Sequence, residues 1–242
     1  MDKNNQPRSW EIDSLRGLMI VLMVVYHLTF DLAFYGTLNF NLENFAWRCF
    51  AWFIAGSFLL LVGVSLTLSA NRRQRQILHH HLKRGAFIFG GGMLITLITY
   101  ILTPRMPIVF GILHLIGLAI IITYPFLRFK LVNLISGLII IVGGIYLATK
   151  SIAFSWLIWL GLAPTNFASL DYYPLLPWLG IVLIGIALGN IFYPQGQRKL
   201  KIADWSGYLV VKNLSFFGRH SLLIYFIHQP IIITALALIN LV

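Results

Sequence analysis

The sequence predicts an all-α integral membrane protein, a single domain over residues 1–242 built as one bundle of about seven transmembrane helices. Three observations support this prediction. The chain is 59% hydrophobic and only 10% charged, with a mean hydropathy of +0.83, whereas soluble domains carry far more charge. Its apolar runs are long and unbroken, unlike the alternating strands of an outer-membrane barrel. Its basic residues lie between those runs, so we attribute the net charge of +11 to membrane topology and expect no nucleic-acid partner.

The first half of the chain supplies three of these spans. After a polar lead-in over residues 1–12, apolar runs of crossing length cover about 15–34, 46–69 and 85–102. Small residues in the second run favour close contact with a neighbouring helix. The strongly basic loop 71–84 separates the second run from the third.

The second half supplies four more spans. Apolar runs cover about 108–127, 131–148 and 177–193, and the last extends from 216 to the C-terminus. The basic loop 194–213 precedes the last run. Residues 151–163 are apolar but too short to cross comfortably, so we expect an interfacial or re-entrant segment there, with its tryptophans at headgroup level.

The basic residues predict the orientation of the spans. With the N-terminus in the cytoplasm, all lysines and arginines except Arg48, Arg105 and Lys150 fall on the cytoplasmic side. This asymmetry follows the positive-inside rule and predicts an N-in, C-out protein. We therefore expect a multi-pass protein of the cell membrane, which is the plasma or inner membrane if the source is bacterial.

The first span carries a line of ionisable residues. Counting about 100° per residue from Arg16, His27 falls near 20°, and Asp13 and Asp31 each fall near 60°, on one stripe of the helix. Asp13 to Asp31 covers roughly 27 Å, close to the ~30 Å hydrocarbon thickness. Each ionisable group at such depth costs about 2.5–3.5 kcal/mol even on the lenient insertion scale, so such groups normally face protein or a wet cavity. The stripe is the strongest functional indication in the sequence.

His27 and Asp31 are the candidate catalytic pair. Residues four apart meet on one helical face, and a carboxylate beside an imidazole fixes its tautomer and supports the imidazolium. Such an imidazole can act as a general base toward an amine or hydroxyl, or carry an acyl group itself as a nucleophile. Equally, the two side chains can satisfy each other as a helix-packing pair.

The last apolar run offers a matching face. Tyr225, His228 and Gln229 lie within about 100° of one another around a helix. Pro230 leaves the carbonyl of Phe226 without its helical partner about half-way through the membrane. A kink beside a His-Gln pair shapes a site in some bundles and is plain packing in others. We predict Tyr225, His228 and Gln229 as cavity-lining residues.

Two further polar residues are weaker candidates. His114 in the fourth run and Asp171 in the loop before the sixth are candidate cavity or acceptor contacts, although a structural histidine and a simple turn give the same pattern. We predict no metal site. The three consecutive histidines at 79–81 point about 100° apart on a helix and cannot chelate one ion. The single cysteine, Cys49, excludes an intrachain disulfide and a Cys-based site.

Four blocks of the sequence, in order, resemble a known family. They are RSWEIDSLRGLMIVLMVVYH, GILHLIGLAIII, SLDYYPLLPWLGIVLIGIALG and LSFFGRHSLLIYFIHQP. They are similar to blocks of the heparan-alpha-glucosaminide N-acetyltransferase catalytic-domain family of membrane-bound sugar acyltransferases. The opening D-x-x-R-G before a histidine-bearing helix is also similar to the wider group of integral-membrane sugar O-acyltransferases. The residues that fall on the matched blocks are Asp13, Arg16, His27, His114, Asp171, His228 and Gln229.

The resemblance implies transfer of an acyl group, typically acetyl from acetyl-CoA, to a sugar amine or hydroxyl on the extracytoplasmic side. It implies acyl-CoA as a co-substrate, with no tightly bound cofactor. The bases of loops 71–84 and 194–213 are mainly topogenic, but some of them, with Arg16, can attract the phosphates of a cytoplasmic donor, and we take Arg16 and Asp13 as the candidate donor-binding residues. The implied partners are membrane lipid and a glycan or glycolipid acceptor, with a homo-oligomer left open. The proposed catalytic histidine of the animal lysosomal members, in the loop after this helix, has no counterpart in residues 36–45, which leaves His27 as the comparable base.

Two other classes of protein fit the residues alone. A small transporter or channel would use the polar stripe of the first span as a substrate or proton path. A polytopic scaffold would need the polar pairs only for packing. An acyltransferase is distinguished from both by dependence on an acyl thioester and on His27.

Overall fold

The computed structural model describes residues 9–72, 77–150, 152 and 155–239, and over these residues the chain is all-helical, which confirms the predicted fold class. The α-helices are α1 (Trp10–Phe34), α2 (Phe45–Arg72), α3 (Ile77–Leu102), α4 (Ile112–Ile122), α5 (Leu131–Ala148), α6 (Leu175–Phe192), α7 (Leu209–Arg219) and α8 (Ser221–Leu238). Short 3₁₀ helices are η2 (Tyr124–Phe126), η3 (Ser155–Leu160) and η4 (Pro194–Gly196). Within the described ranges there is no strand, and Phe110 and Tyr172 form an isolated bridge.

Six of these helices are long and apolar enough to cross a membrane. They are Trp10–Phe34, Phe45–Asn71, Leu78–Leu102, Leu131–Ala148, Leu175–Phe192 and Ser221–Leu238. The run expected at 108–127 contains only α4, which has 11 residues, and the η2 turn. Eleven residues rise about 16 Å, roughly half the hydrocarbon thickness. The described chain therefore has six candidate spans and one short apolar helix, and the N-in, C-out orientation stays a prediction.

The segment 71–84, expected to be a loop, is largely helical, so that expectation was wrong, whereas the loop expected at 194–213 is helical only at its two ends. In the basic segment 71–84, α2 continues to Arg72 and α3 begins at Ile77. Hydropathy marks where a helix crosses lipid but not where it ends, and Lys and Arg are good helix formers. In the segment 194–213, residues 197–208 between η4 and α7 are non-helical.

The last expected span, from 216 onward, is two helices rather than one. α7 ends at Arg219, His220 is non-helical with φ −102° and ψ 15°, and α8 begins at Ser221. α7 is amphipathic and only 11 residues long, so a search for apolar runs of crossing length does not find it. The apolar segment expected at 151–163 contains the six-residue η3, and residues 151, 153 and 154 lie outside the described chain.

The described chain divides into two compact units. Residues 9–61 and 202–239 form one, called here the terminal unit because it joins the two ends of the sequence. Residues 62–201 form the other, the central unit. α2 contributes residues to both units. The expectation of one domain over 1–242 stays a prediction.

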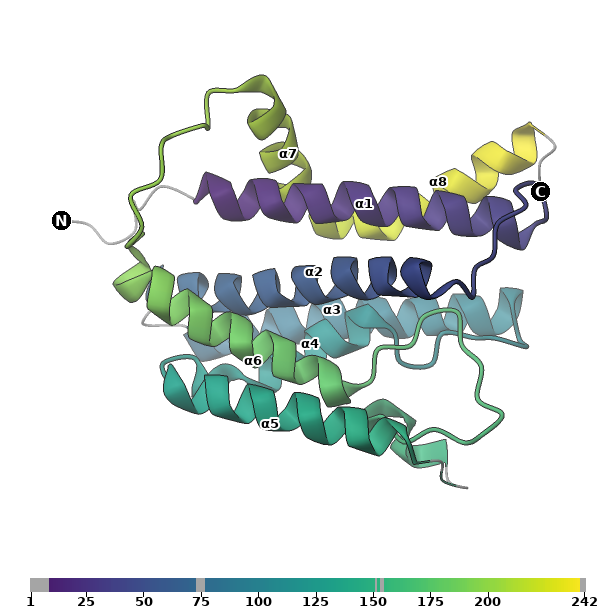
Figure 1. Ribbon diagram of the computed structural model, residues 1–242, viewed down its shortest axis with the longest axis horizontal. Coiled ribbons are helices and arrows are strands. Elements are labelled where there is room, and N and C mark those ends of the chain that lie inside the picture. Colours follow the sequence, from purple (N-terminus) through teal and green to yellow (C-terminus); the bar gives the residue numbers. More distant parts are fainter. Residues whose placement is uncertain (1–8, 73–76, 151, 153–154, 240–242) are drawn as a thin grey trace. The chain divides into compact units, whose positions relative to one another are not determined.

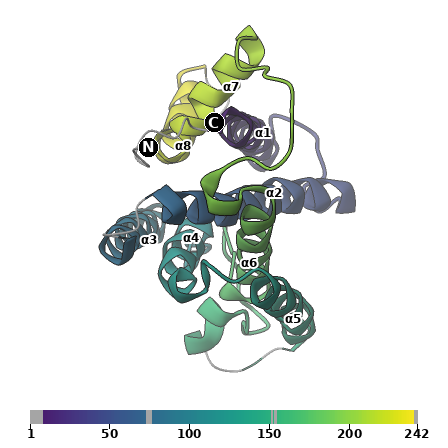
Figure 2. The same cartoon turned by 90° about the vertical axis from the view of Figure 1, so that its left-hand side faces the viewer.

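In the terminal unit, α7 and α8 both pack on α1, as Figures 1 and 2 show. α7 crosses α1 at two glycines. A Cβ added at Gly17 would lie 1.8 Å from the Leu214 carbonyl oxygen, and one added at Gly218 would lie 1.8 Å from the Asp13 carbonyl oxygen. The backbones of the two helices are therefore in direct contact. Further along α1, Ile20 and Met23 form a buried cluster with Ile54 of α2.

In the central unit, α5 lies beside α6 and α3 beside α4 (Figure 2). The last turns of α2 pack on α6, where Thr67 donates a hydrogen bond to the Ile186 carbonyl at 3.2 Å. Thr67 and Ile186 are fully buried. The core of this unit is aliphatic and includes Leu66, Leu115, Ile120 and Val182.

Candidate active site

The four residues of the predicted polar stripe on α1 face the other helices of the terminal unit. Asp13 and Arg16 lie where α7 crosses α1. His27 and Asp31, three to four turns further along, contact α8. The stripe that the helical wheel predicts is therefore turned toward α7 and α8.

His27 has a defined tautomer. Its Nδ1 lies 2.9 Å from the carbonyl oxygen of Met23, one turn earlier in α1. Because a carbonyl oxygen only accepts hydrogen bonds, Nδ1 carries the proton, and the lone pair of the neutral ring is on Nε2. The ring also packs edge-on against Tyr26, with ring centroids 5.5 Å apart. The half-buried His27 therefore presents Nε2 as the atom that can take a proton.

His228 of α8 lies directly against His27. The two ring centroids are 4.8 Å apart with an interplanar angle of 76°. The Nδ1 of His228 donates to the Tyr225 carbonyl oxygen at 2.7 Å, so its lone pair is also on Nε2. This Nε2 is buried and has no hydrogen-bond partner in the part of the chain that the structure describes. A buried acceptor without a partner is uncommon in folded proteins.

Asp31 is 3% exposed and is bound to α8 instead of to His27. The Gln229 Nε2 donates to both carboxylate oxygens of Asp31, at 2.9 Å each. The predicted pairing of Asp31 with His27 is thus replaced by a link between two helices. The Oε1 of Gln229 is buried and unpartnered among the described residues.

Tyr225 and Pro230 complete this part of α8. The Tyr225 ring lies 5.6 Å from the His228 ring and packs against the buried cluster of Ile20, Met23 and Ile54. α8 continues as a helix through Pro230. Because proline has no N–H, the carbonyl of Phe226 loses its usual helical partner in the turn that carries His228.

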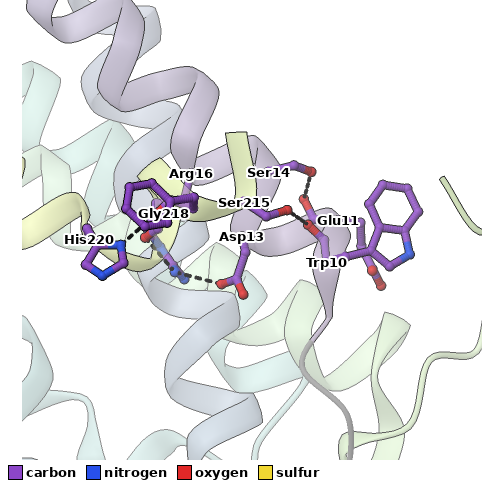
Figure 3. Close-up of polar contacts among 9 residues, drawn as sticks. Trp10, Glu11, Asp13, Ser14, Arg16, Ser215, Gly218 and His220 are labelled. Atoms are coloured by element: carbon purple, nitrogen blue, oxygen red, sulfur yellow. Dashed lines mark hydrogen bonds and ion pairs between the residues drawn. The ribbon is translucent and has the colours of Figure 1, made fainter. Parts of the chain in front are cut away.

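At the other end of α1, Arg16 ties that helix to α7. Figure 3 shows its guanidinium pointing toward the Asp13 carboxylate and the Gly218 carbonyl. The Nη1 atom lies 3.2 Å from Asp13 Oδ1 and 3.5 Å from the Gly218 oxygen. Ser215 adds a weak hydrogen bond to the Trp10 carbonyl at 3.4 Å. These contacts hold the glycine crossing, and donor binding by Asp13 and Arg16 stays a prediction.

His114 and Asp171 lie in the central unit, where both cap the N-terminus of α4. The Gly111 N–H donates to His114 Nδ1 at 3.1 Å, and the Ile112 N–H donates to Asp171 Oδ2 at 3.0 Å. The other ring nitrogen of His114 lies 3.2 Å from the Thr96 hydroxyl oxygen. These contacts are those of a helix cap. Any contact of His114 or Asp171 with a substrate stays a prediction.

Sequence reasoning did not single out the aromatic residues around His27. Tyr26 stacks on Trp47 with ring centroids 4.7 Å apart, and Phe50 also packs against both rings. Trp47 lies in the first turn of α2, where the sequence shows a tryptophan at the start of an apolar run. That signal is equally typical of an aromatic belt at a membrane interface.

Among the described residues, no group of three or more His, Cys, Asp or Glu side chains could hold a metal ion.

Comparison with known proteins identifies the family. Searches of curated proteins and of solved structures gave no significant match. The sequence model of the family described as "Heparan-alpha-glucosaminide N-acetyltransferase, catalytic" matches residues 8–230, which include every predicted site residue. The resemblance inferred from the four sequence blocks is confirmed, and the chain belongs to the heparan-alpha-glucosaminide N-acetyltransferase catalytic family.

Proposed function

We propose that this protein is an integral-membrane acyltransferase that moves an acyl group, expected to be acetyl, from acyl-CoA to a sugar amine or hydroxyl on the extracytoplasmic side. Membership of an acetyltransferase family and six candidate spans support a membrane-bound transferase. The observation that carries the assignment to a site is the half-buried His27, whose Nδ1 is bound to the Met23 carbonyl and whose Nε2 is left as the base.

In the proposed reaction, His27 Nε2 removes the proton from the acceptor nitrogen or oxygen as that atom attacks the acyl carbon of the thioester. The new N–C or O–C bond forms, the C–S bond breaks, and the sulfur leaves as a thiolate. The imidazolium of His27 then returns its proton to the sulfur, so that free CoA thiol is the second product. A covalent variant, in which His27 Nε2 itself takes the acyl group before the acceptor arrives, uses the same atom.

The donor is proposed to approach from the cytoplasmic side, with its phosphates near Arg16 and the basic loops. Asp13 is proposed to belong to the same donor site through its ion pair with Arg16. The guanidinium of Arg16 lies at the α1–α7 crossing. Arg219, which follows Gly218 in α7, is exposed. Bidentate guanidinium groups are well suited to phosphate. Tyr225 and His228 are the proposed contacts on the acceptor side, and an envelope glycan or glycolipid is the expected acceptor.

The test is an assay of purified protein with acetyl-CoA and a panel of amino sugars and membrane glycolipids. CoA thiol release is measured with a thiol reagent, in a Cys49→Ser background to remove the signal of the protein itself, and the product is identified by mass spectrometry. We expect thiol release that depends on the acceptor and falls by about 10²–10⁴-fold in His27→Ala.

Two results would count against this function. One is full activity in a correctly folded His27→Ala variant. The other is flux of a sugar or of protons into liposomes that does not depend on CoA, which would favour a transporter that uses the same residues. Labelling of the wild type, but not of His27→Ala, by radioactive acyl-CoA would favour the covalent variant.

A further inference from the structure

Among the contacts of α1 with α8, two between polar side chains lie about one helical turn apart. The first is the edge contact of the His27 and His228 rings, with centroids 4.8 Å apart. The second is the pair of 2.9 Å hydrogen bonds from Gln229 Nε2 to Asp31. His228 and Gln229 are neighbours in the chain, so the second contact fixes the backbone that carries the first.

Asp31 is not needed to fix the tautomer of His27. The Met23 carbonyl already fixes the tautomer of His27, which is the task that a carboxylate performs in a catalytic triad. Both oxygens of Asp31 accept from Gln229. The ring of α8 that lies directly against His27 is the imidazole of His228.

The turn of α8 that carries His228 needs an external support. Pro230 removes the hydrogen bond that the Phe226 carbonyl would otherwise accept, and a helix distorts most easily where its backbone hydrogen bonds are missing. Gln229 lies within that turn, next to His228. Its bond to the buried Asp31 is the polar contact that can keep the turn in place.

We propose that Asp31 is a positioning residue that acts through Gln229 to hold His228 against His27. Its meaning for catalysis rests on the proposed acyltransferase function, whereas the link itself can be tested without any activity. Asp31 is then not the charge partner of His27, contrary to what the i, i+4 spacing suggests.

The first test compares Asp31→Asn with Asp31→Leu. The Asn Oδ1 can still accept from Gln229 Nε2, and its amide can donate to the unpartnered Gln229 Oε1. We expect Asp31→Asn to lose at most about tenfold in kcat, to keep the pH profile of kcat/KM, and to unfold at the same temperature as the wild type or higher. Asp31→Leu should lose more activity and unfold at a lower temperature.

A charge partner gives the opposite pattern. Replacing the carboxylate of a triad by an amide lowers kcat by about 10⁴-fold and changes the pH profile. That result for Asp31→Asn, with a wild-type melting temperature, would overturn the proposal.

The exchanged pair, Asp31→Gln with Gln229→Asp, is the matched rescue variant. It keeps the amide–carboxylate bond and the combined length of the two side chains, but it moves the charge from α1 to α8. We expect it to recover the melting temperature, and most of the activity, that Gln229→Leu loses. If neither the melting temperature nor the activity of the exchanged pair exceeds that of Gln229→Leu, a positioning role is contradicted.

A third arm does not depend on acyl transfer. If Asp31 holds His228 in place, His228→Ala should lower the melting temperature of the wild type but add little in an Asp31→Leu background, because the contact is already lost. Additive shifts would show that the two contacts are independent and would overturn the link. Absence of any acyl transfer by the wild type would refute the proposed function and leave this arm valid.

Discussion

The crossing of α1 and α7 allows a sharp prediction about Gly17. An alanine at this position would put its Cβ 1.8 Å from the Leu214 carbonyl oxygen, 2.6 Å from its carbonyl carbon and 3.0 Å from the Gly218 nitrogen. All three atoms are main chain, so no side chain can turn away to make room. To reach the 3.4 Å at which ordinary contact begins, the backbones must separate by about 1.6 Å.

Such a separation breaks several contacts together. It lengthens the 3.5 Å contact of Arg16 with the Gly218 carbonyl and the 3.4 Å hydrogen bond of Ser215, both of which span the crossing. Overpacking typically costs about 1–3 kcal/mol, and an obstacle of rigid main chain lies at the upper end or beyond. For a chain of this size, about 3 kcal/mol lowers the melting temperature by roughly 6–12 °C.

The assay is thermal unfolding of the purified variant in detergent, with Gly143→Ala as the matched control. Gly143 lies in α5 and has no atom within 4 Å of an added Cβ, so alanine there should be neutral or should stabilise by up to about 1 kcal/mol through helix propensity. If Gly17→Ala melts at the same temperature as Gly143→Ala, the close crossing of α1 and α7 is refuted. Gly218→Ala, whose Cβ would meet the Asp13 carbonyl oxygen, should behave like Gly17→Ala.

Two further predictions concern the central unit. Asp171→Ala removes the carboxylate that accepts from the Ile112 N–H, and should destabilise the protein by about 1 kcal/mol in thermal unfolding. Asp171→Asn keeps an acceptor and should lose less stability. Equal losses of stability in the two variants would contradict the cap. Burial raises the pKa of Tyr172 from 10.0 to about 12. The stability that this tyrosine contributes is complete below about pH 10 and is lost as pH rises through the folded pKa, because the unfolded chain releases the proton first. In an absorbance titration, Tyr172→Phe should remove an ionisation with a midpoint near 12, and loss of a step near 10 would show that the phenol is not buried.

Hydropathy and helical geometry account for what the sequence predicted well. Long apolar runs located α1, α2, α3, α5, α6 and α8, because crossing a bilayer requires that length and composition. The turn of 100° per residue placed Asp13, Arg16, His27 and Asp31 on one face, which is a property of a single helix. The family was also recognisable, because each of its four blocks is a continuous run of residues in the sequence.

Pairings between helices were not predictable in the same way. Asp31 and Gln229 are 198 residues apart, and nothing within either helix gives the register of α1 against α8. The i, i+4 spacing suggested His27 as the partner of Asp31 because it is a local rule. The same limit applies to Asp171, whose bond to the start of α4 joins residues 59 positions apart, and to the glycine crossing that α7 makes with α1.

The Nδ1 atoms of both histidines are bound to main-chain carbonyls, and this affects how substitutions can alter the two rings. Met23 and Tyr225 set the tautomers of His27 and His228 through peptide oxygens, which are present whatever side chain occupies those positions. No point substitution can delete them while the helices remain intact. Substitutions of neighbouring residues can therefore change the basicity of the two rings one at a time, while Nδ1 keeps its proton and Nε2 its lone pair.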